Sequence, residues 1–139
     1  MIVLDTNVLS ELMRPFPSEA VLRWFAGRSA ATLFTTTIIQ AEILFGLALL
    51  PEGRRRSDLL MAAEQMFAED LAGRVLPFDS MAAKAFAPIA AERRQKGWQT
   101  GAFDVQVAAI AVSRGAALAT RNVADFLDCG IPIIDPWES

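Results

Sequence analysis

Short apolar runs alternate along the chain with longer segments in which apolar residues recur at helical spacing. Apolar or β-branched runs of strand length lie at residues 2–4, 32–35, 74–78, 117–120 and 131–134. The segments between them carry helix caps and end at Pro or Gly. This alternation predicts an α/β fold, a three-layer α/β/α sandwich with a mainly parallel central sheet.

The expected helices cover residues 8–13, 19–27, 38–50, 52–72, 81–96, 102–113 and 122–127. The helix over 38–50 is apolar almost all round, which predicts a central place in the core. A chain of 139 residues is long enough for one domain with a real core, so we expect a single domain over residues 1–139.

The first apolar run ends abruptly in an acid. Ile2–Leu4 is typical of a buried parallel strand, and Asp5 then stands at its carboxyl end. In an open α/β sheet the carboxyl ends of the strands form the ligand-binding edge. Asp5 is therefore expected at a site, although capping the next helix would explain an Asp there equally well.

Two further acids stand alone in apolar surroundings. Glu42 and Asp104 have no other charged residue within seven positions on either side. Helical spacing puts Glu42 on the face of Phe45 and Leu49, and Asp104 on the face of Val107, so both faces are expected to point to the core. Buried carboxylates that meet repel one another unless a divalent cation lies among them, and oxygen ligands favour Mg²⁺ or Mn²⁺. Asp104 alone is equally explained by the dipole of its helix.

The end of the fourth expected strand supplies a further candidate ligand. Asn122 follows that strand as Asp5 follows the first, and its amide oxygen is able to ligate a metal or orient a water. An N-cap for the next short helix explains Asn122 equally well. For Asp125 the sequence favours a residue of the first helical turn, which interacts with the dipole, over a peripheral acid of the site.

Composition narrows the chemistry. The chain has no histidine and one cysteine, Cys129, which excludes Ser-His-Asp machinery, an internal disulfide and thiolate metal clusters. The formal net charge of −3 does not indicate nucleic-acid binding by itself. Two basic clusters, 54–56 and 93–96, are best explained by a solvated helix end and by a helix dipole; a phosphate-binding patch or a site for an acidic partner segment is the alternative for 54–56.

No basic leader precedes the first strand, and no uncharged stretch is long enough to span a membrane. We therefore expect a cytoplasmic protein with no membrane partner. The hydrophobic fraction of 53% is high for a monomer, which predicts apolar surface buried against a partner.

These residues resemble a known family. The segments Leu-Asp-Thr-Asn-Val-Leu-Ser-Glu at 4–11, Ala-Glu at 41–42, Asp104 opening a helix, and Ala-Thr-Arg-Asn at 119–122 are similar to those of PIN domains. The finer resemblance is to VapC toxins of type II toxin–antitoxin pairs, in the FitB-like branch. It is carried by the segments 42–56, 73–79 and Asp-Pro-Trp at 135–137, and it spans essentially the whole chain.

The resemblance implies a Mg²⁺-dependent endoribonuclease, with Mn²⁺ as a substitute, that cleaves RNA and is inhibited by a cognate antitoxin. It implies a homodimer or a dimer of dimers that contacts DNA only through the antitoxin. Asp5 and Asp104 fall on direct metal ligands, and Glu42 on a ligand through water or a base. Asn122 falls on a position that is often Asp in this branch. Thr6 and Arg121 are expected to contact the substrate.

Two other functions remain open from the sequence. One is a catalytically weak PIN domain that serves mainly as the antitoxin's partner in a DNA-bound repressor, which Asn122 favours. The other is a phosphatase of the haloacid-dehalogenase type, which also uses an acid after the first strand with Mg²⁺. That chemistry requires a second Asp two residues later, where this chain has Asn7.

Overall fold

The centre of the molecule is a sheet of five strands in which every neighbouring pair is parallel, in a computed structural model that describes residues 1–138. The strands lie in the order β3-β2-β1-β4-β5. Their bounds are Ile2–Leu4 for β1, Leu33–Thr36 for β2, Val75–Leu76 for β3, Ala117–Ala119 for β4 and Ile133–Ile134 for β5. The predicted parallel sheet is confirmed, and its first strand lies in the middle.

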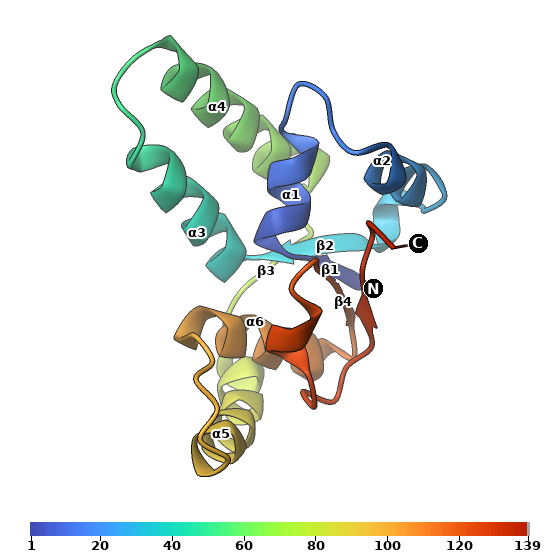
Figure 1. The fold of residues 1–139 in the computed structure, drawn as a ribbon, viewed down its shortest axis with the longest axis vertical. Coiled ribbons are helices and arrows are strands. Elements are labelled where there is room, and N and C mark those ends of the chain that lie inside the picture. Colours follow the sequence, from blue (N-terminus) through green and yellow to red (C-terminus); the bar gives the residue numbers. More distant parts are fainter. Residues whose placement is uncertain (139) are drawn as a thin grey trace.

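Helices cover both faces of this sheet (Figure 1), with α1 to α4 on one side and α5 and α6 on the other. They are α1 (Thr6–Leu12), α2 (Glu19–Ala26), α3 (Thr37–Ala48), α4 (Arg54–Gln65), α5 (Ser80–Gln95) and α6 (Ala102–Arg114). Two short 3₁₀ helices, η1 (Ala30–Thr32) and η3 (Val123–Phe126), and a π-helical turn, η2 (Met66–Asp70), complete the described elements. Within residues 1–138 no helix has both the length and the apolar character needed to cross a membrane.

Side chains that follow or end a strand cap the N-termini of two helices. The Asp5 carboxylate accepts a hydrogen bond from the Thr6 backbone at 2.8 Å and so caps α1. Thr36, the last residue of β2, caps α3 by accepting from the Ile39 backbone N–H at 3.1 Å. A cap of this kind stabilises a helix by about 1 kcal/mol and turns the chain sharply at the carboxyl edge of the sheet.

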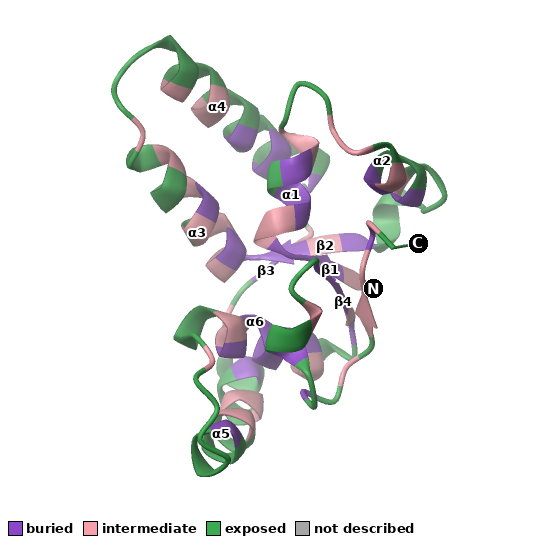
Figure 2. Cartoon of the chain, viewed as in Figure 1, coloured by how far each residue is buried: buried purple, intermediate pink, exposed green. Residues whose placement is uncertain are grey.

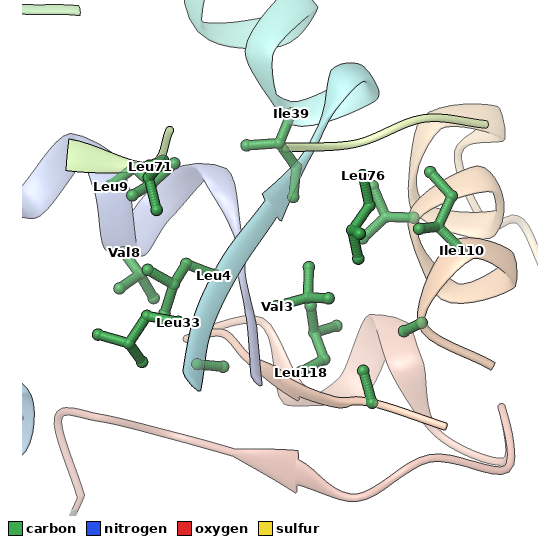
Figure 3. Packing of buried hydrophobic residues seen from close by; sticks show 14 of the residues in the cluster. Val3, Leu4, Val8, Leu9, Leu33, Ile39, Leu71, Leu76, Ile110 and Leu118 are labelled. Atoms are coloured by element: carbon green, nitrogen blue, oxygen red, sulfur yellow. The ribbon is translucent and has the colours of Figure 1, made fainter. Parts of the chain in front are cut away.

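The core consists of two layers, one on each face of the sheet (Figure 3). Leu4 of β1 lies on the side of Val8 in α1, whereas Val3 and Leu118 lie on the side of Ile110 in α6. All five side chains are almost fully buried, which stabilises the fold by about 1.5–3 kcal/mol for each of the large ones. Because successive side chains of β1 point to opposite faces of the sheet, this one strand packs against both helical layers.

The prediction that α3 lies centrally is wrong. Its first half packs on the sheet through Ile39 and Ile43, but Phe45 and Leu49 are 64% and 69% exposed. Figure 2 shows that the second half of α3 extends beyond the sheet beside α4, with exposed residues along it. An apolar pattern all round a helix does not reveal which part of its length another element covers.

Two glycines give a paired test of this backbone. Gly115 ends α6 with φ +63°, whereas Gly46 lies inside α3 with open space where a Cβ would be. Gly115→Ala is expected to lower the free energy of unfolding by about 1–2 kcal/mol because a side chain disfavours the left-handed region. Gly46→Ala is expected to raise it by about 0.5–1 kcal/mol because alanine favours the helix. Urea unfolding followed by circular dichroism measures both changes in the free energy of unfolding. Changes of the same sign would contradict the left-handed conformation of Gly115 or the helical conformation of Gly46.

Candidate active site

Asp5 occupies the carboxyl edge of the sheet at the point where the strand order reverses. β1 pairs with β2 on one side and β4 on the other, so the connections diverge here, which is where α/β sheets bind ligands. The side chain is 5% exposed. Its Oδ2 accepts hydrogen bonds from the Thr120 hydroxyl at 2.7 Å and from the Asn7 amide at 3.3 Å. Asp5 is thus both the cap of α1 and a fixed acid at this edge.

Asn7 and Thr120 join the ends of β1 and β4 around this acid. The Asn7 amide nitrogen also donates to Thr120 Oγ1 at 3.2 Å, and its Oδ1 accepts from the Arg121 backbone at 3.0 Å. Thr120 is fully buried, and its hydroxyl also accepts a hydrogen bond from the Asn122 backbone at 3.0 Å. The sequence placed neither Asn7 nor Thr120 among the candidate site residues, although both lie in the segments that carry the family resemblance.

Glu42 approaches Asp5 from α3. Its Oε1 is buried and has no hydrogen-bond partner. Burial first, and then the charges of Asp5 and Asp104, raise the pKa of Glu42 to about 6. The prediction that the face of α3 carrying Glu42 points to the core is wrong. Phe45 and Leu49 on that face are exposed, and Glu42 lines a groove.

Asp104 approaches from the opposite helical layer, in the first turn of α6. Burial, followed by the charges of Asp5 and Asp125, raises the pKa of Asp104 to about 6. The core-directed face predicted for this helix is correct, since Val107 is fully buried. Asp5, Glu42 and Asp104 are therefore within electrostatic reach of one another, although they lie far apart in the sequence.

Asp125, which the sequence favoured as a first-turn residue of the next short helix, also acts electrostatically on two of the candidate acids. It does lie in the first turn of η3, as expected. Its charge also raises the pKa of both Asp5 and Asp104, so Asp125 lies within electrostatic reach of these acids. The segment Thr-Arg-Asn-Val-Ala-Asp at 120–125 places Asp125 shortly after β4, in η3, which packs beside α6, the helix that carries Asp104.

Among residues 1–138, no Lys or Arg side chain forms an ion pair with the acids at this edge. Ion pairs among residues 1–138 involve other carboxylates, those of Glu11, Glu92 and Asp79. As the side chains stand in the described part of the chain, no three potential ligands converge closely enough to hold a metal ion. The donors nevertheless fit a hard divalent cation: all are oxygens, they repel one another, and the buried Glu42 Oε1 lacks a partner.

The remaining predicted site residues lie around these acids. The Thr6 hydroxyl is buried without a hydrogen-bond partner and lines the same groove as Glu42. Asn122 is exposed and occupies the N-cap position of η3, as its capping alternative expected, but its side chain makes no capping hydrogen bond. The Arg121 guanidinium lies over the Trp137 ring at 4.9 Å from its centroid.

A groove of about 850 Å³ opens between α1, α3 and α4. Apolar side chains such as Met13 and Leu47 line most of it, with Thr6 and Glu42 among its polar residues. Arg54 and Arg55 also line the groove, at the beginning of α4. The basic cluster 54–56, best explained from the sequence as a solvated helix end, therefore contributes to a concave surface.

The raised pKa values predict an unusual dependence of stability on pH. Glu42 and Asp104 bind protons more tightly in the folded than in the unfolded chain, with ordinary values of 4.5 and 3.8. Their stabilising effect is complete below those values and is lost as the pH rises through about 6. Without divalent cations, the melting temperature is expected to fall from pH 5 to pH 7.5. Thermal unfolding followed by circular dichroism measures it.

Glu42→Gln is the matched variant, because the neutral amide removes one of the repelling charges. It is expected to flatten the pH dependence and to raise the melting temperature at pH 7.5. Added Mn²⁺ is expected to stabilise the unmodified protein more at pH 7.5 than at pH 5. A melting temperature that rises steadily from pH 5 to pH 7.5 without cations would contradict this account.

The chain matches the model of the PIN domain over residues 2–128. It is 44% identical to the VapC ribonuclease Y4jK of Sinorhizobium fredii over 99% of both chains, and 35% identical to toxin FitB of Neisseria gonorrhoeae over 99% of both. The solved structure of FitAB bound to the IR36 DNA fragment superposes with a TM-score of 0.90 at 35% identity, covering 99% of this chain and 96% of that one. On the sequence, the parallel sheet and the acids at its carboxyl edge, the chain belongs to the PIN-domain family, with VapC and FitB proteins as relatives.

Proposed function

We propose that the protein is a Mg²⁺-dependent endoribonuclease and the toxin of a type II toxin–antitoxin pair. One observation carries the proposal: Asp5, Glu42 and Asp104 act electrostatically on one another at the ligand-binding edge of a PIN-domain sheet, with no cation paired to any of them among residues 1–138. The relative named VapC ribonuclease supports nuclease chemistry, and the relative named toxin FitB supports the biological role.

Asp5 and Asp104 would hold the cation directly, and Glu42 would bind it through water or act as a base. When bound, Mg²⁺ or Mn²⁺ lowers the pKa of a coordinated water and offsets negative charge on the phosphate. The Thr120 hydroxyl and the Asn7 amide keep Asp5 in one orientation. Orientation of this kind removes much of the entropic cost of assembling the reacting groups.

Glu42 is the candidate general base. Among residues 1–138, its Oε1 has no hydrogen-bond partner. Its pKa of about 6 lies near neutral pH, where a general base is mostly unprotonated and still accepts a proton readily. The Thr6 hydroxyl, also unpartnered, would donate to a phosphate oxygen. Arg121 and Asn122 would contact the RNA at the exposed rim of the site. Single-stranded RNA is the favoured substrate because its bases are free to be splayed apart.

The groove between α1, α3 and α4 is our candidate site for the antitoxin. It is concave and mainly apolar, and Arg54 and Arg55 would pair with acidic side chains of the bound segment. The solved structure of FitAB bound to a DNA fragment supports a complex that binds DNA, and we propose that the antitoxin makes the DNA contacts. A homodimer or dimer of dimers would bury exposed apolar side chains such as Phe45 and Phe103.

The phosphatase alternative has no support in this structure. Asn7 stands where that chemistry requires a second acid, and its amide is used to hold Asp5 and Thr120. The weak-nuclease alternative remains distinguishable by experiment, because it predicts metal binding without RNA cleavage.

Asp5→Asn is expected to abolish cleavage, and Glu42→Gln to slow it by about 100-fold to 10,000-fold. The assay combines the protein, freed of antitoxin, with labelled single-stranded RNA and Mn²⁺ or Mg²⁺. Gel electrophoresis of the labelled fragments measures the cleavage rate. Glu64→Gln, an exposed acid of α4, is the matched control and should cleave normally. Equal cleavage by Asp5→Asn, or by the unmodified protein in EDTA, would overturn the proposal.

Replacing Arg54 and Arg55 together by Glu is expected to weaken the antitoxin complex by roughly tenfold or more, since two attractive pairs become repulsive. Isothermal titration with the purified antitoxin measures the affinity, and RNA cleavage by the free variant should persist. Arg23→Glu, an exposed arginine of α2, is the control. Unchanged affinity in the double variant would place the antitoxin elsewhere.

A further inference from the structure

Arg93, near the end of α5, is a buried charge that the helix dipole does not explain. It is only 6% exposed, whereas its neighbours Arg94 and Lys96 are exposed. Among residues 1–138 no carboxylate forms an ion pair with it. A guanidinium removed from water is costly unless its N–H groups are satisfied, so the contacts that it makes are the reason for its place.

The two ends of the guanidinium contact two different segments. Its Nη1 donates to the Thr100 hydroxyl at 2.7 Å. Its Nη2 donates to the Leu127 carbonyl at 2.6 Å and to the buried Cys129 Sγ at 2.8 Å. The planar fork of arginine fixes the relative direction of such partners, which a lysine ammonium does not do.

Each of these segments is joined to one acid of the candidate active site. Thr100 lies four residues before Asp104, in the loop that leads into α6. Leu127 lies two residues after Asp125 and directly follows η3. Arg93 therefore links the two short stretches of chain that carry Asp104 and Asp125.

The loop before α6 is held from a second side as well. The Trp98 ring lies against the Arg93 guanidinium, 5.3 Å from ring centroid to Cζ, and the Trp98 backbone N–H donates to the Arg93 carbonyl at 2.9 Å. The Lys96 ammonium lies 4.6 Å from the same ring. The loop thus wraps around Arg93, and the positive charge of Arg93 opposes the repulsion that Asp5 and Asp125 exert on Asp104.

We propose that Arg93 is a positioning residue of the candidate active site: its guanidinium holds the start of α6 against the segment after η3, and so fixes the spacing of Asp104 and Asp125. The inference rests on the proposed function only in that these acids bind a divalent cation. The proposal includes Asp125 in the site. Arg93, which is not one of the acids, would then set the distance between Asp125 and Asp104.

Three roles for Arg93 predict different results. A positioning role requires the fork, so Arg93→Lys and Arg93→Gln should both weaken Mn²⁺ binding by about tenfold to 100-fold, as removal of outer-shell partners does. A role in charge balance alone predicts normal binding by Arg93→Lys and tighter binding by Arg93→Gln. A role in stability alone predicts a lower melting temperature for both variants with normal Mn²⁺ affinity.

The experiment measures Mn²⁺ affinity by isothermal titration on the full chain without RNA, and hydrogen exchange on the same samples. We expect weaker Mn²⁺ binding and faster exchange confined to residues 100–106 and 123–129 in both Arg93 variants. Arg94→Lys and Arg94→Gln are matched controls and should bind Mn²⁺ within about twofold of the unmodified protein, as an exposed charge contributes little. Normal binding by Arg93→Lys with tighter binding by Arg93→Gln, or lower melting temperatures with normal Mn²⁺ affinity in both variants, overturns the proposal.

Thr100 keeps the test decisive if the Arg93 variants fail to fold. Thr100→Val removes the hydroxyl that accepts from Arg93 with little change in shape, and Thr100→Ser retains it. Weaker Mn²⁺ binding by Thr100→Val with recovery in Thr100→Ser supports the proposal, and equal binding overturns it. If the unmodified protein binds no Mn²⁺, the proposed function fails, and the positioning role is then decided by hydrogen exchange in these two segments alone.

Discussion

The hydrogen bond from the Thr120 hydroxyl to the Asp5 carboxylate is the contact on which the site depends. It joins the ends of β1 and β4, the two parallel strands between which the order of the sheet reverses. Burial raises the pKa of Asp5, and the hydrogen bonds from Thr120, Thr6 and Asn7 oppose that rise. Without these donors the acid would lose both its fixed orientation and much of its tendency to ionise.

The other acids reach Asp5 from the two helical layers. Glu42 comes from α3 on one side of the sheet, and Asp104 comes from α6 on the other. Burial first, and then the charges of neighbouring acids, raise the pKa of Glu42 and Asp104 to about 6, which means that the folded chain is less stable when they are charged. A fold that keeps unpaired acids together exchanges stability for a site that attracts a cation, as functional sites commonly do.

The two layers differ in how firmly they hold their acid. On the α6 side, Arg93 ties the loop before the helix to the segment after η3 by three hydrogen bonds. On the α3 side, a groove lies beside Glu42, and the outer half of the helix carries exposed Phe45 and Leu49. The rigid side suits a fixed metal ligand, and the open side suits access for a substrate or partner.

The sequence determined the elements and the principal acids. Apolar runs of strand length predicted all five strands, because a parallel strand covered on both faces must be apolar throughout. Asp5, Glu42 and Asp104 stood out because charges in apolar surroundings are costly unless they serve a purpose. The resemblance to PIN domains added the family, which the comparisons confirm.

Only the tertiary structure decided what covers each face and what contacts each charge. The apolar pattern of α3 did not show that its outer half extends beyond the sheet. The pattern gives the polarity of each side chain but not which other element packs against it. Asp125 and Arg93 had adequate local explanations in helix dipoles. Their electrostatic effects on Asp104, and the hydrogen bonds of Arg93 to Thr100, Leu127 and Cys129, depend on how separate elements pack, and no spacing along the chain encodes them.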